Sequence, residues 1–421
     1  MTLAEKILAR ASGNKEVAAG DYVTAKIDVA MAHEGAAWVI DELMKVGIDR
    51  VWDPERIVIL FDHWAPAPTE LTATMHKKVR EFVRRHGIKY FYDIKEGICH
   101  QVMPELGHVR PGELIVGTDS HTTTYGAFGA GGTGIGTTDM AVVWVTGELW
   151  FRVPETIRFY IKGSLPRYVM SKDVILYIAG RYGTEVAQYK SIEFEGPTIR
   201  DMSVSSRMTI SNMAMELGAK FALMAPDEKV IEYVKGRTTK PFTPLYSDPD
   251  AIYERLYELD VSDLEPQVAF PHSVDNVRPV SKAEGIKIDQ AFLGSCTNGR
   301  FEDLAAAAEI LRGRKVNPSV RMIVIPASRR VYLEALKAGI IEVLINAGAV
   351  VCNPTCGPCM GTHLGLLTEG ERCISSSNRN FKGRMGSPKA EIYLASPYVV
   401  AASAVTGEIT DPRRLMGGEG R

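Results

Sequence analysis

Three cysteines with metal-ligand spacing lie in the segment VCNPTCGPCMG, residues 351–361. Cys352, Cys356 and Cys359 follow the pattern C-x3-C-x2-C and are surrounded by prolines and glycines. The turn from Cys356 to Cys359 is of the CxxC type, which presents two thiolates to one metal or to each other. A further cysteine, Cys296, lies 60 residues before Cys356 and follows a predicted strand. These thiols therefore indicate metal or redox chemistry.

Four interpretations fit these thiols. Incidental buried cysteines are the simplest, and a thioredoxin-like pair is disfavoured because that motif belongs to a helix start after an early strand. A structural zinc site needs four ligands, and a second CxxC or a finger-spaced histidine pair is missing. The fourth is an iron–sulfur cluster with three protein thiolates and one open iron. Its ligands are either Cys352, Cys356 and Cys359, as in radical-SAM enzymes, or Cys296, Cys356 and Cys359.

Reactive side chains also follow three predicted strands. Each strand runs directly into polar residues: Asp62-His63 after 56–61, Asp119-Ser120-His121 after 113–117, and Ser295-Cys296 after 290–294. In open parallel sheets, ligand sites lie beyond the carboxyl ends of the strands. We therefore expect these three strand ends to converge on one site.

The elements that must position these residues alternate along the chain. Apolar, β-branched runs predict strands at 56–61, 113–117, 290–294, 321–325 and 391–395. Helical patterns lie between them, for example at 301–314 and 329–348. This alternation predicts an α/β protein with largely parallel sheets. Composition shifts near Val153-Pro154 and Val280-Ser281 predict three α/β/α domains over residues 1–154, 155–282 and 283–421.

Composition and charge narrow the class of protein. Lysine and arginine total 49 and aspartate and glutamate total 51, so no overall basic field attracts nucleic acid or an anionic membrane. No apolar run reaches the roughly 18 residues of a membrane span. The first residues predict an amphipathic helix rather than a secretory signal. Six cysteines in 421 residues are too sparse for a disulfide scaffold. We expect a cytoplasmic protein that binds neither nucleic acid nor membrane.

A set of ordered motifs resembles one enzyme family over essentially the whole chain. The motifs are FDH (61–63), GICHQ (97–101), GTDSHT (117–122), RMTISNMAMELGAK (207–220), FLGSCTNGR (292–300), CGPCMG (356–361), SNRNFKGRMG (377–386) and YLASP (393–397). Together they resemble the aconitase superfamily. Within it, the chain is most similar to the large subunits of two-chain 3-isopropylmalate dehydratases and homoaconitases.

The resemblance implies a [4Fe–4S] cluster on Cys296, Cys356 and Cys359, with one iron open to solvent or substrate. Such a cluster acts as a Lewis acid and not as an electron carrier. Cys352 then falls outside the ligand set. Cys99 and Cys373 are expected to be structural. The fold implied is aconitase-like, with three domains packed around the cluster.

The resemblance also assigns roles to side chains. Asp62 and His63 match the proton-donating pair for a departing hydroxyl. The remaining catalytic positions are His100, Asp119, His121 and Glu216. Substrate-binding positions are His33, Ser120, Asn212, Arg379 and Arg384, with Lys382 adding positive charge and Asn298 steadying the cluster region. Asn212 and Glu216 are spaced to share one helical face.

The implied activity is that of a hydro-lyase of leucine biosynthesis that isomerises 2-isopropylmalate to 3-isopropylmalate by dehydration and rehydration. Homoaconitase or a methylmalate-type hydratase is the alternative within the class. The chain ends where single-chain aconitases continue into a swivelling domain. We therefore expect a small subunit carrying that domain, in a heterodimer or heterotetramer, and little turnover without it.

Two further expectations concern alternatives and departures. A radical-SAM enzyme would require Cys352, and an RNA-binding cluster sensor would require a cation-rich cleft. After GTDSHT, Thr123 and Tyr125 stand where relatives are expected to carry Cys and His, and Gly131-Gly132 replaces Phe-Ala. This departure predicts an altered substrate preference or partner interface.

Overall fold

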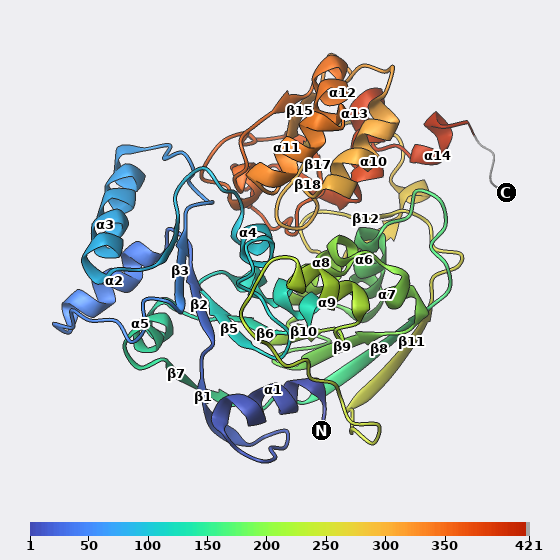
Figure 1. Cartoon of the computed structure of the whole chain (residues 1–421). Coiled ribbons are helices and arrows are strands. Elements are labelled where there is room, and N and C mark those ends of the chain that lie inside the picture. Colours follow the sequence, from blue (N-terminus) through green and yellow to red (C-terminus); the bar gives the residue numbers. More distant parts are fainter. Residues whose placement is uncertain (418–421) are drawn as a thin grey trace. The chain divides into compact units, whose positions relative to one another are not determined.

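A computed structural model describes residues 1–417 of the chain (Figure 1). The chain divides into two compact units. Unit 1 comprises residues 1–94, 99–162 and 187–260. Unit 2 comprises residues 95–98, 163–186 and the chain from Val261 onward. The three-domain division stays a prediction, and its last four residues lie outside the described part of the chain.

Unit 1 contains a five-stranded parallel sheet. Its strands, in spatial order, are β4 (Tyr90–Tyr92), β3 (Ile57–Leu60), β2 (Val29–Ala32), β5 (Leu114–Gly117) and β6 (Gly131–Gly134). After β2, the chain adds β3 and then β4 on one side of it, and β5 and then β6 on its other side. The strand order therefore reverses between β2 and β5, which is the position where open α/β sheets bind ligands.

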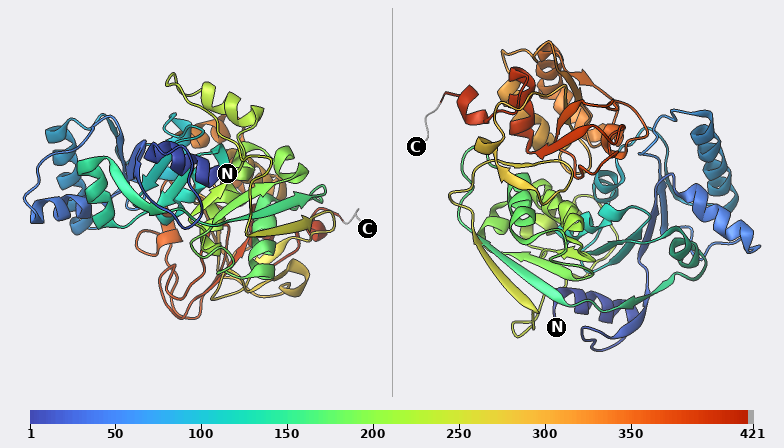
Figure 2. Two further views of the ribbon diagram at one scale, coloured as in Figure 1. Left: turned by 90° about the horizontal axis from the view of Figure 1, so that it is seen from below. Right: turned by 180° about the vertical axis from the view of Figure 1, so that it is seen from behind.

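Helices cover this sheet and pack on its apolar side chains. They are α1 (Leu3–Ser12), α2 (Ala36–Lys45), α3 (Glu70–His86), α4 (Cys99–Glu105), α5 (Thr137–Thr146) and the 3-10 helix η1 (Ser120–Phe128). Helix α2 contacts both α3 and α5, and Figure 2 shows these helices on one flank of the sheet. Helix α3 begins at a Thr69 capping box and ends at Gly87, which adopts a left-handed φ of 62°. An antiparallel pair, β1 (Tyr22–Lys26) and β7 (Glu148–Arg152), borders the unit.

A second sheet of unit 1 has four parallel strands. Their spatial order is β10 (Phe221–Leu223), β9 (Ser191–Glu195), β8 (Thr156–Lys162) and β11 (Arg255–Asp260). The helices in this region are α7 (Pro197–Asp201), α8 (Val204–Met213), η2 (Ala214–Leu217) and α9 (Glu228–Lys235). Helix α8 lies against η1, so it connects this region to the carboxyl end of β5.

Unit 2 contains a seven-stranded sheet. Its strands, in spatial order, are β13 (Val277–Pro279), β12 (Gln267–Ala269), β18 (Glu391–Ala395), β17 (Arg372–Ser375), β14 (Gln290–Leu293), β15 (Arg321–Val324) and β16 (Val350–Val351). The strands from β18 to β16 are parallel, and β12 runs antiparallel to both of its neighbours. The strand order reverses between β14 and β17. This sheet therefore has a second switch point.

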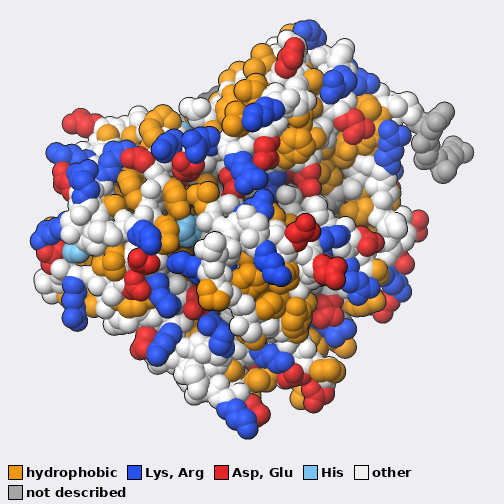
Figure 3. Space-filling model, in the orientation of Figure 1, with side chains coloured by type: hydrophobic (Ala, Val, Ile, Leu, Met, Phe, Trp, Pro, Cys, Tyr) orange, Lys and Arg blue, Asp and Glu red, His pale blue; other side chains and the backbone are white. Residues whose placement is uncertain are grey.

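The helices of unit 2 flank this sheet. They are α6 (Ser171–Tyr182), η3 (Val280–Lys282), α10 (Phe301–Leu311), α11 (Arg329–Lys337), α12 (Ile340–Ala347), η4 (Gly357–Met360), α13 (Pro397–Thr406) and α14 (Pro412–Leu415). None of the helices in residues 1–417 combines the length and apolar character needed to cross a bilayer. Lysines and arginines are intermixed with acidic side chains on the face shown in Figure 3.

The α/β class with largely parallel sheets is confirmed. The five predicted strands form β3, β5, β14, β15 and β18. One predicted helix differs, because the stretch 329–348 forms α11 and α12 with a break at Gly339. Gly339 has a left-handed φ of 74°, which a continuous right-handed helix cannot accommodate.

Candidate functional site

The carboxyl-terminal edge of the five-stranded sheet gathers most of the predicted catalytic side chains. Three neighbouring strands end there, and each runs into a polar pair: β2 into His33-Glu34, β3 into Asp62-His63, and β5 into the segment with Asp119 and His121. Parallel strands all present their carboxyl ends to the same edge. The local sequence therefore places these groups side by side at the switch point between β2 and β5.

Asp62 and His63 form a buried pair. Asp62 Oδ1 lies 2.6 Å from His63 Nδ1, and Asp62 Oδ2 accepts the backbone N–H of Cys99 at 2.7 Å. Burial by itself would raise the pKa of Asp62, but the charge and hydrogen bond of His63 outweigh it and lower that pKa. An ionised carboxylate only accepts, so His63 Nδ1 carries the donated proton. His63 Nε2 is then left to face Asp119 Oδ2 at 3.3 Å.

Asp119 is shared by three histidines. Its Oδ1 lies 2.8 Å from His100 Nε2 and accepts the backbone N–H of His121 at 2.7 Å. Burial opposes ionisation of Asp119, but the charge of His100 and hydrogen bonds from His100, His121 and His63 hold its pKa well below the usual range. Asp119 is therefore a fixed anion that orients the surrounding imidazoles.

Glu216 and Asn212 reach the same edge from the other region of unit 1. Glu216 Oε1 lies 2.8 Å from His121 Nε2, and Asn212 Nδ2 donates to Thr124 Oγ1 at 2.9 Å. The predicted single helix over both residues is wrong, because α8 ends at Met213. Glu216 instead lies in the 3-10 helix η2, and this turn aims its carboxylate at His121.

The remaining predicted side chains of unit 1 lie around this network. The half-buried His33 ring lies against the His63 ring at a tilt of 31°, with the ring centroids 4.3 Å apart. Burial lowers the pKa of His33, and the neighbouring His63 lowers it further. Ser120 Oγ lies 3.5 Å from His121 Nδ1. The divergent Tyr125 is fully buried, and its hydroxyl lies 3.3 Å from His100 Nδ1.

Glu34 belongs to this site and was not among the predicted residues. It is fully buried and accepts the backbone N–H groups of His63, at 3.2 Å, and Trp64, at 2.9 Å. Glu34 therefore fixes the turn that presents the His63 ring. The sequence signal was available, since a carboxylate directly after β2 lies at the same strand-end level as Asp62.

The predicted cluster cysteines lie at the switch point of the unit 2 sheet. Cys296 follows β14, and Asn378 follows the adjacent strand β17. Asn378 Nδ2 lies 3.5 Å from Cys296 Sγ, and its Oδ1 accepts from Cys359 Sγ at 3.5 Å. Cys296 and Cys356 also share one small buried group with Ile98. The structure thus brings Cys296 together with Cys356 and Cys359, through an asparagine that the sequence argument missed.

Basic residues accompany these thiols. Arg384 Nη2 lies 3.9 Å from Cys359 Sγ. Arg379 and Arg384 are half-buried, and Lys382 is exposed; all three lie between β17 and β18. This loop is therefore the local concentration of cations beside the cysteines of unit 2.

Lys172 is a second residue of unit 2 that sequence reasoning missed. Its side chain is completely buried, and Nζ donates to the carbonyl oxygens of Ser376, at 2.7 Å, and Ser377, at 2.6 Å. Burial lowers the pKa of Lys172 to about 7, against the raising effect of nearby carboxylates and cysteines. Lys172 therefore anchors the turn that carries Asn378. No local pattern marks it, because 204 residues separate Lys172 from Ser376.

The other cysteines differ in environment. Burial raises the pKa of the half-buried Cys352 and raises that of the fully buried Cys373 to about 12. Both thiols are therefore held in the neutral form. Cys99 is the first residue of α4 and is buried in the core. Asn298 Nδ2 donates to Asp303 Oδ1 at 2.9 Å and so braces the turn after Cys296.

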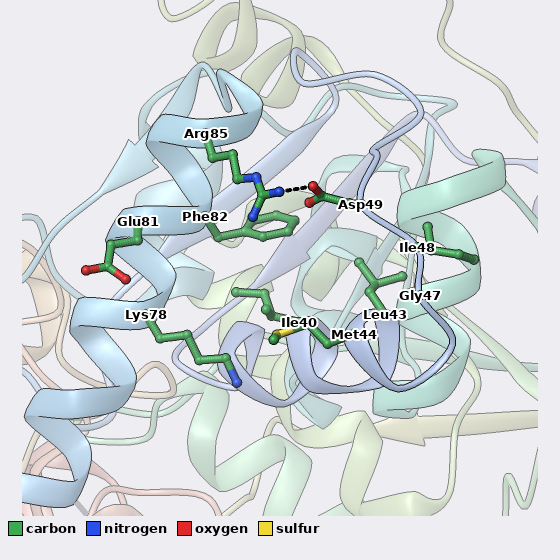
Figure 4. A pocket seen from close by; sticks show the side chains of 10 residues that line it. All are labelled: Ile40, Leu43, Met44, Gly47, Ile48, Asp49, Lys78, Glu81, Phe82 and Arg85. Atoms are coloured by element: carbon green, nitrogen blue, oxygen red, sulfur yellow. Dashed lines mark hydrogen bonds and ion pairs between the residues drawn. The ribbon is translucent and has the colours of Figure 1, made fainter.

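One large hollow contains none of the predicted site residues. Helices α2 and α3 enclose about 490 Å³ lined mainly by apolar side chains such as Ile40, Leu43 and Phe82 (Figure 4). Arg85 and Asp49 form an ion pair at this hollow. It lies beside helices and away from the strand ends, so it takes no part in the site described above.

Comparison with known proteins identifies the family of this chain. The family model described as the Aconitase family (aconitate hydratase) matches residues 5–284 and 280–407. The chain therefore belongs to the aconitase family. It is 59% identical to the 3-isopropylmalate dehydratase large subunit 1 of Methanopyrus kandleri, with 99% of each chain covered. It is 54% identical to the 3-isopropylmalate dehydratase large subunit of Aquifex aeolicus, over 100% of this chain and 98% of that one.

The chain is also similar to a homoaconitase subunit and to a solved structure. The probable methanogen homoaconitase large subunit of Methanothermobacter thermautotrophicus is 53% identical, with 99% of each chain covered. The crystal structure of Thermococcus kodakaraensis aconitase X matches with a TM-score of 0.50 and 13% identity, over 92% of this chain and 87% of that one. The latter similarity concerns the fold alone.

Proposed function

We propose that this chain is the cluster-bearing large subunit of a hydro-lyase that isomerises 2-isopropylmalate to 3-isopropylmalate in leucine biosynthesis. The observation that carries the proposal is identity of 50–59% over nearly the whole chain to proteins named 3-isopropylmalate dehydratase large subunit. The word "large" in those names supports a small-subunit partner. We infer that this partner carries the swivelling domain and completes the enzyme.

Three buried thiols of unit 2 are available to hold an iron–sulfur cluster: Cys296, Cys356 and Cys359. Iron–sulfur clusters are held by cysteine thiolates, and three of them leave one iron of a four-iron cluster open. Such a cluster with one open iron supplies Lewis acidity toward a hydroxyl and a carboxylate of the substrate.

The side chains of unit 1 supply proton transfer in this proposal. Asp62 holds the Nδ1–H of His63, which leaves Nε2 as the nitrogen that gives a proton to the departing hydroxyl. Asp119 stabilises the protonated ring from 3.3 Å. The hydroxyl then leaves as water, while a base on the small subunit removes the proton from the neighbouring carbon. Rehydration reverses these transfers with the hydroxyl on the other carbon.

Cationic and polar side chains bind the substrate in this proposal. Isopropylmalate carries two carboxylates, and guanidinium groups bind carboxylates with paired hydrogen bonds. We assign this role to Arg379 and Arg384, which are half-buried and lie on the loop that follows Asn378. His33, Ser120 and Asn212 are the polar contacts proposed in unit 1, and Glu216 acts with His121.

Homoaconitase is the second candidate function. Its support is specific, because two probable methanogen homoaconitase large subunits are 54% and 53% identical to this chain. Both reactions would use the same acid and cluster, and they differ in the side chain of the hydroxy acid.

The test is reconstitution with iron and sulfide under anaerobic conditions, followed by assays with either type of small subunit. Isopropylmalate and homocitrate-derived substrates are compared in parallel. His63→Asn should abolish turnover, whereas His86→Asn, at the end of α3, should keep it. Electron paramagnetic resonance of mildly oxidised protein should show a three-iron signal that disappears on adding Fe²⁺. Absence of a removable iron would overturn the hydro-lyase proposal.

A further inference from the structure

A cation-lined hollow lies at the opposite edge of the five-stranded sheet from the catalytic residues. It measures about 340 Å³ and is lined by the first residue of β4, Tyr90, by the segment before β5 that includes Arg110, and by the loop after α9. Because β4 and β5 are parallel, their starting ends mark the amino-terminal edge of the sheet. This hollow is therefore separate from the site at the carboxyl-terminal edge.

The loop that forms one wall is firmly packed. Arg237 N–H and Thr238 N–H both donate to the carbonyl of Val234, at 2.9 and 3.1 Å. A Cβ on Gly107 would lie 2.3 Å from the Arg237 carbonyl oxygen, so only glycine permits this approach. The Arg237 guanidinium also stacks 3.5 Å above the Tyr233 ring. Arg237 is thus held at a defined position in the loop.

Three of the four cations that line this hollow have no carboxylate partner in an ion pair among the described residues. No carboxylate is among its lining residues. In the adjoining hollow of about 220 Å³, each carboxylate already has a cation partner: Asp28 with Arg56, Glu55 with Lys89, and Glu113 with Arg110. Within residues 1–417, no acidic side chain forms an ion pair with Lys235, Arg237 or Lys240. Three unbalanced cations in one hollow create a local field that favours an anion.

Two buried groups point to the same conclusion. The Arg237 Nε–H is buried and has no hydrogen-bond partner in the described part of the chain, which is costly unless a ligand supplies an acceptor. Burial, together with the charges of Arg110 and Lys240, lowers the pKa of His108 to about 4. The buried His108 beside this hollow therefore lies in a positive electrostatic potential.

We propose that this hollow binds a small dianionic oxyanion of the phosphate class, as free phosphate or as a phosphate ester. Ammonium, guanidinium and hydroxyl donors from Lys240, Arg237 and Thr239 match the oxygens of such a group. The volume exceeds that of one phosphate, so a phosphorylated small molecule fits. A ligand here acts as an effector or stabiliser and not as the substrate, because the proton-transfer groups lie at the other edge of the sheet.

The test is isothermal titration of the full-length protein with inorganic phosphate at constant ionic strength. The double variant Arg237→Gln/Lys240→Gln removes two donors, each worth about a tenfold loss, so binding should weaken about 100-fold. The matched control Lys162→Gln/Lys190→Gln removes the same charge from cations that pair with Glu258 and Glu254. The control should keep the affinity of the unmodified protein.

Titrations with further ligands identify the class of anion that binds. A sugar phosphate that binds more tightly than phosphate would indicate an ester, and equal binding would indicate the free anion. No phosphate binding at millimolar concentration, or equal losses of affinity in the two double variants, would each overturn the proposal.

Discussion

Replacing Glu34 with glutamine should displace His63 and lower turnover while leaving unit 1 folded. Glu34 is fully buried, and its two carboxylate oxygens accept the N–H groups of His63 and Trp64. Glutamine keeps one acceptor and turns an NH₂ donor toward the other N–H. The variant therefore loses one hydrogen bond to a charged acceptor and leaves a buried donor unsatisfied.

The magnitude follows from those two effects. A hydrogen bond to a charged group contributes about 1.5–3 kcal/mol, and an unsatisfied buried donor costs about 1–3 kcal/mol, so we expect a loss of about 2.5–6 kcal/mol in stability. The His63 backbone relieves the clash by moving. A displacement of about 1 Å at a proton-transfer group lowers the rate on the order of 100-fold.

Glu193→Gln is the matched control for this prediction. Glu193 is buried in β9 and accepts the N–H of Leu3 together with the hydroxyls of Ser247 and Tyr253. The control should lose a comparable free energy of unfolding in urea but keep its turnover. The measurements are urea unfolding of the isolated chain and turnover of the reconstituted two-subunit enzyme. Turnover of Glu34→Gln within threefold of the unmodified protein, or equal rate losses in both variants, would refute the reasoning.

Three further predictions concern pH, the ligand set and the cluster loop. The pKa of His108 falls from 6.5, its ordinary value, to about 4 in the folded protein. Neutral His108 therefore leaves the fold fully stable above pH 6.5, and the free energy of unfolding falls by about 3 kcal/mol as the pH falls to 4. His108→Asn should flatten that part of the pH–stability curve, and parallel curves would contradict this origin. Cys296→Ser should bind little iron after reconstitution, whereas Cys352→Ser should match the unmodified protein in iron content; the reverse order would favour the radical-SAM ligand set. Lys172→Met should speed hydrogen exchange in the segment 376–378 and loosen the removable iron, and unchanged exchange there would argue against its anchoring role.

Much of the fold followed from local sequence. The runs that became β3, β5, β14, β15 and β18 are short, apolar and β-branched, so their pattern predicts buried parallel strands. Helix continuity was harder to predict. The segment 207–220 has helical spacing, but its chain turns into a 3-10 helix after Met213 and stops at Gly218. Spacing gives the period of a helix but not the residue where tertiary contacts end it.

The candidate site was predictable to the extent that its residues form contiguous motifs. Asp62-His63 and Asp119-Ser120-His121 each lie in one short segment at a strand end, and the structure brings both to one edge. The expected third strand end, at Cys296, belongs to β14 in the sheet of unit 2. Its convergence with the other two stays a prediction, as do the catalytic roles assigned to these side chains.

By itself the sequence determined the family, the parallel strands and the residues that chemistry requires at their ends. Those properties depend on neighbours within a few positions, because side-chain periodicity and backbone hydrogen bonding are local. Only the tertiary structure decided that Glu34 holds His63, that Asn378 contacts two cysteines, and that Lys172 anchors the turn beside it. These contacts depend on strand order within a sheet, which brings together segments separated by up to 204 residues.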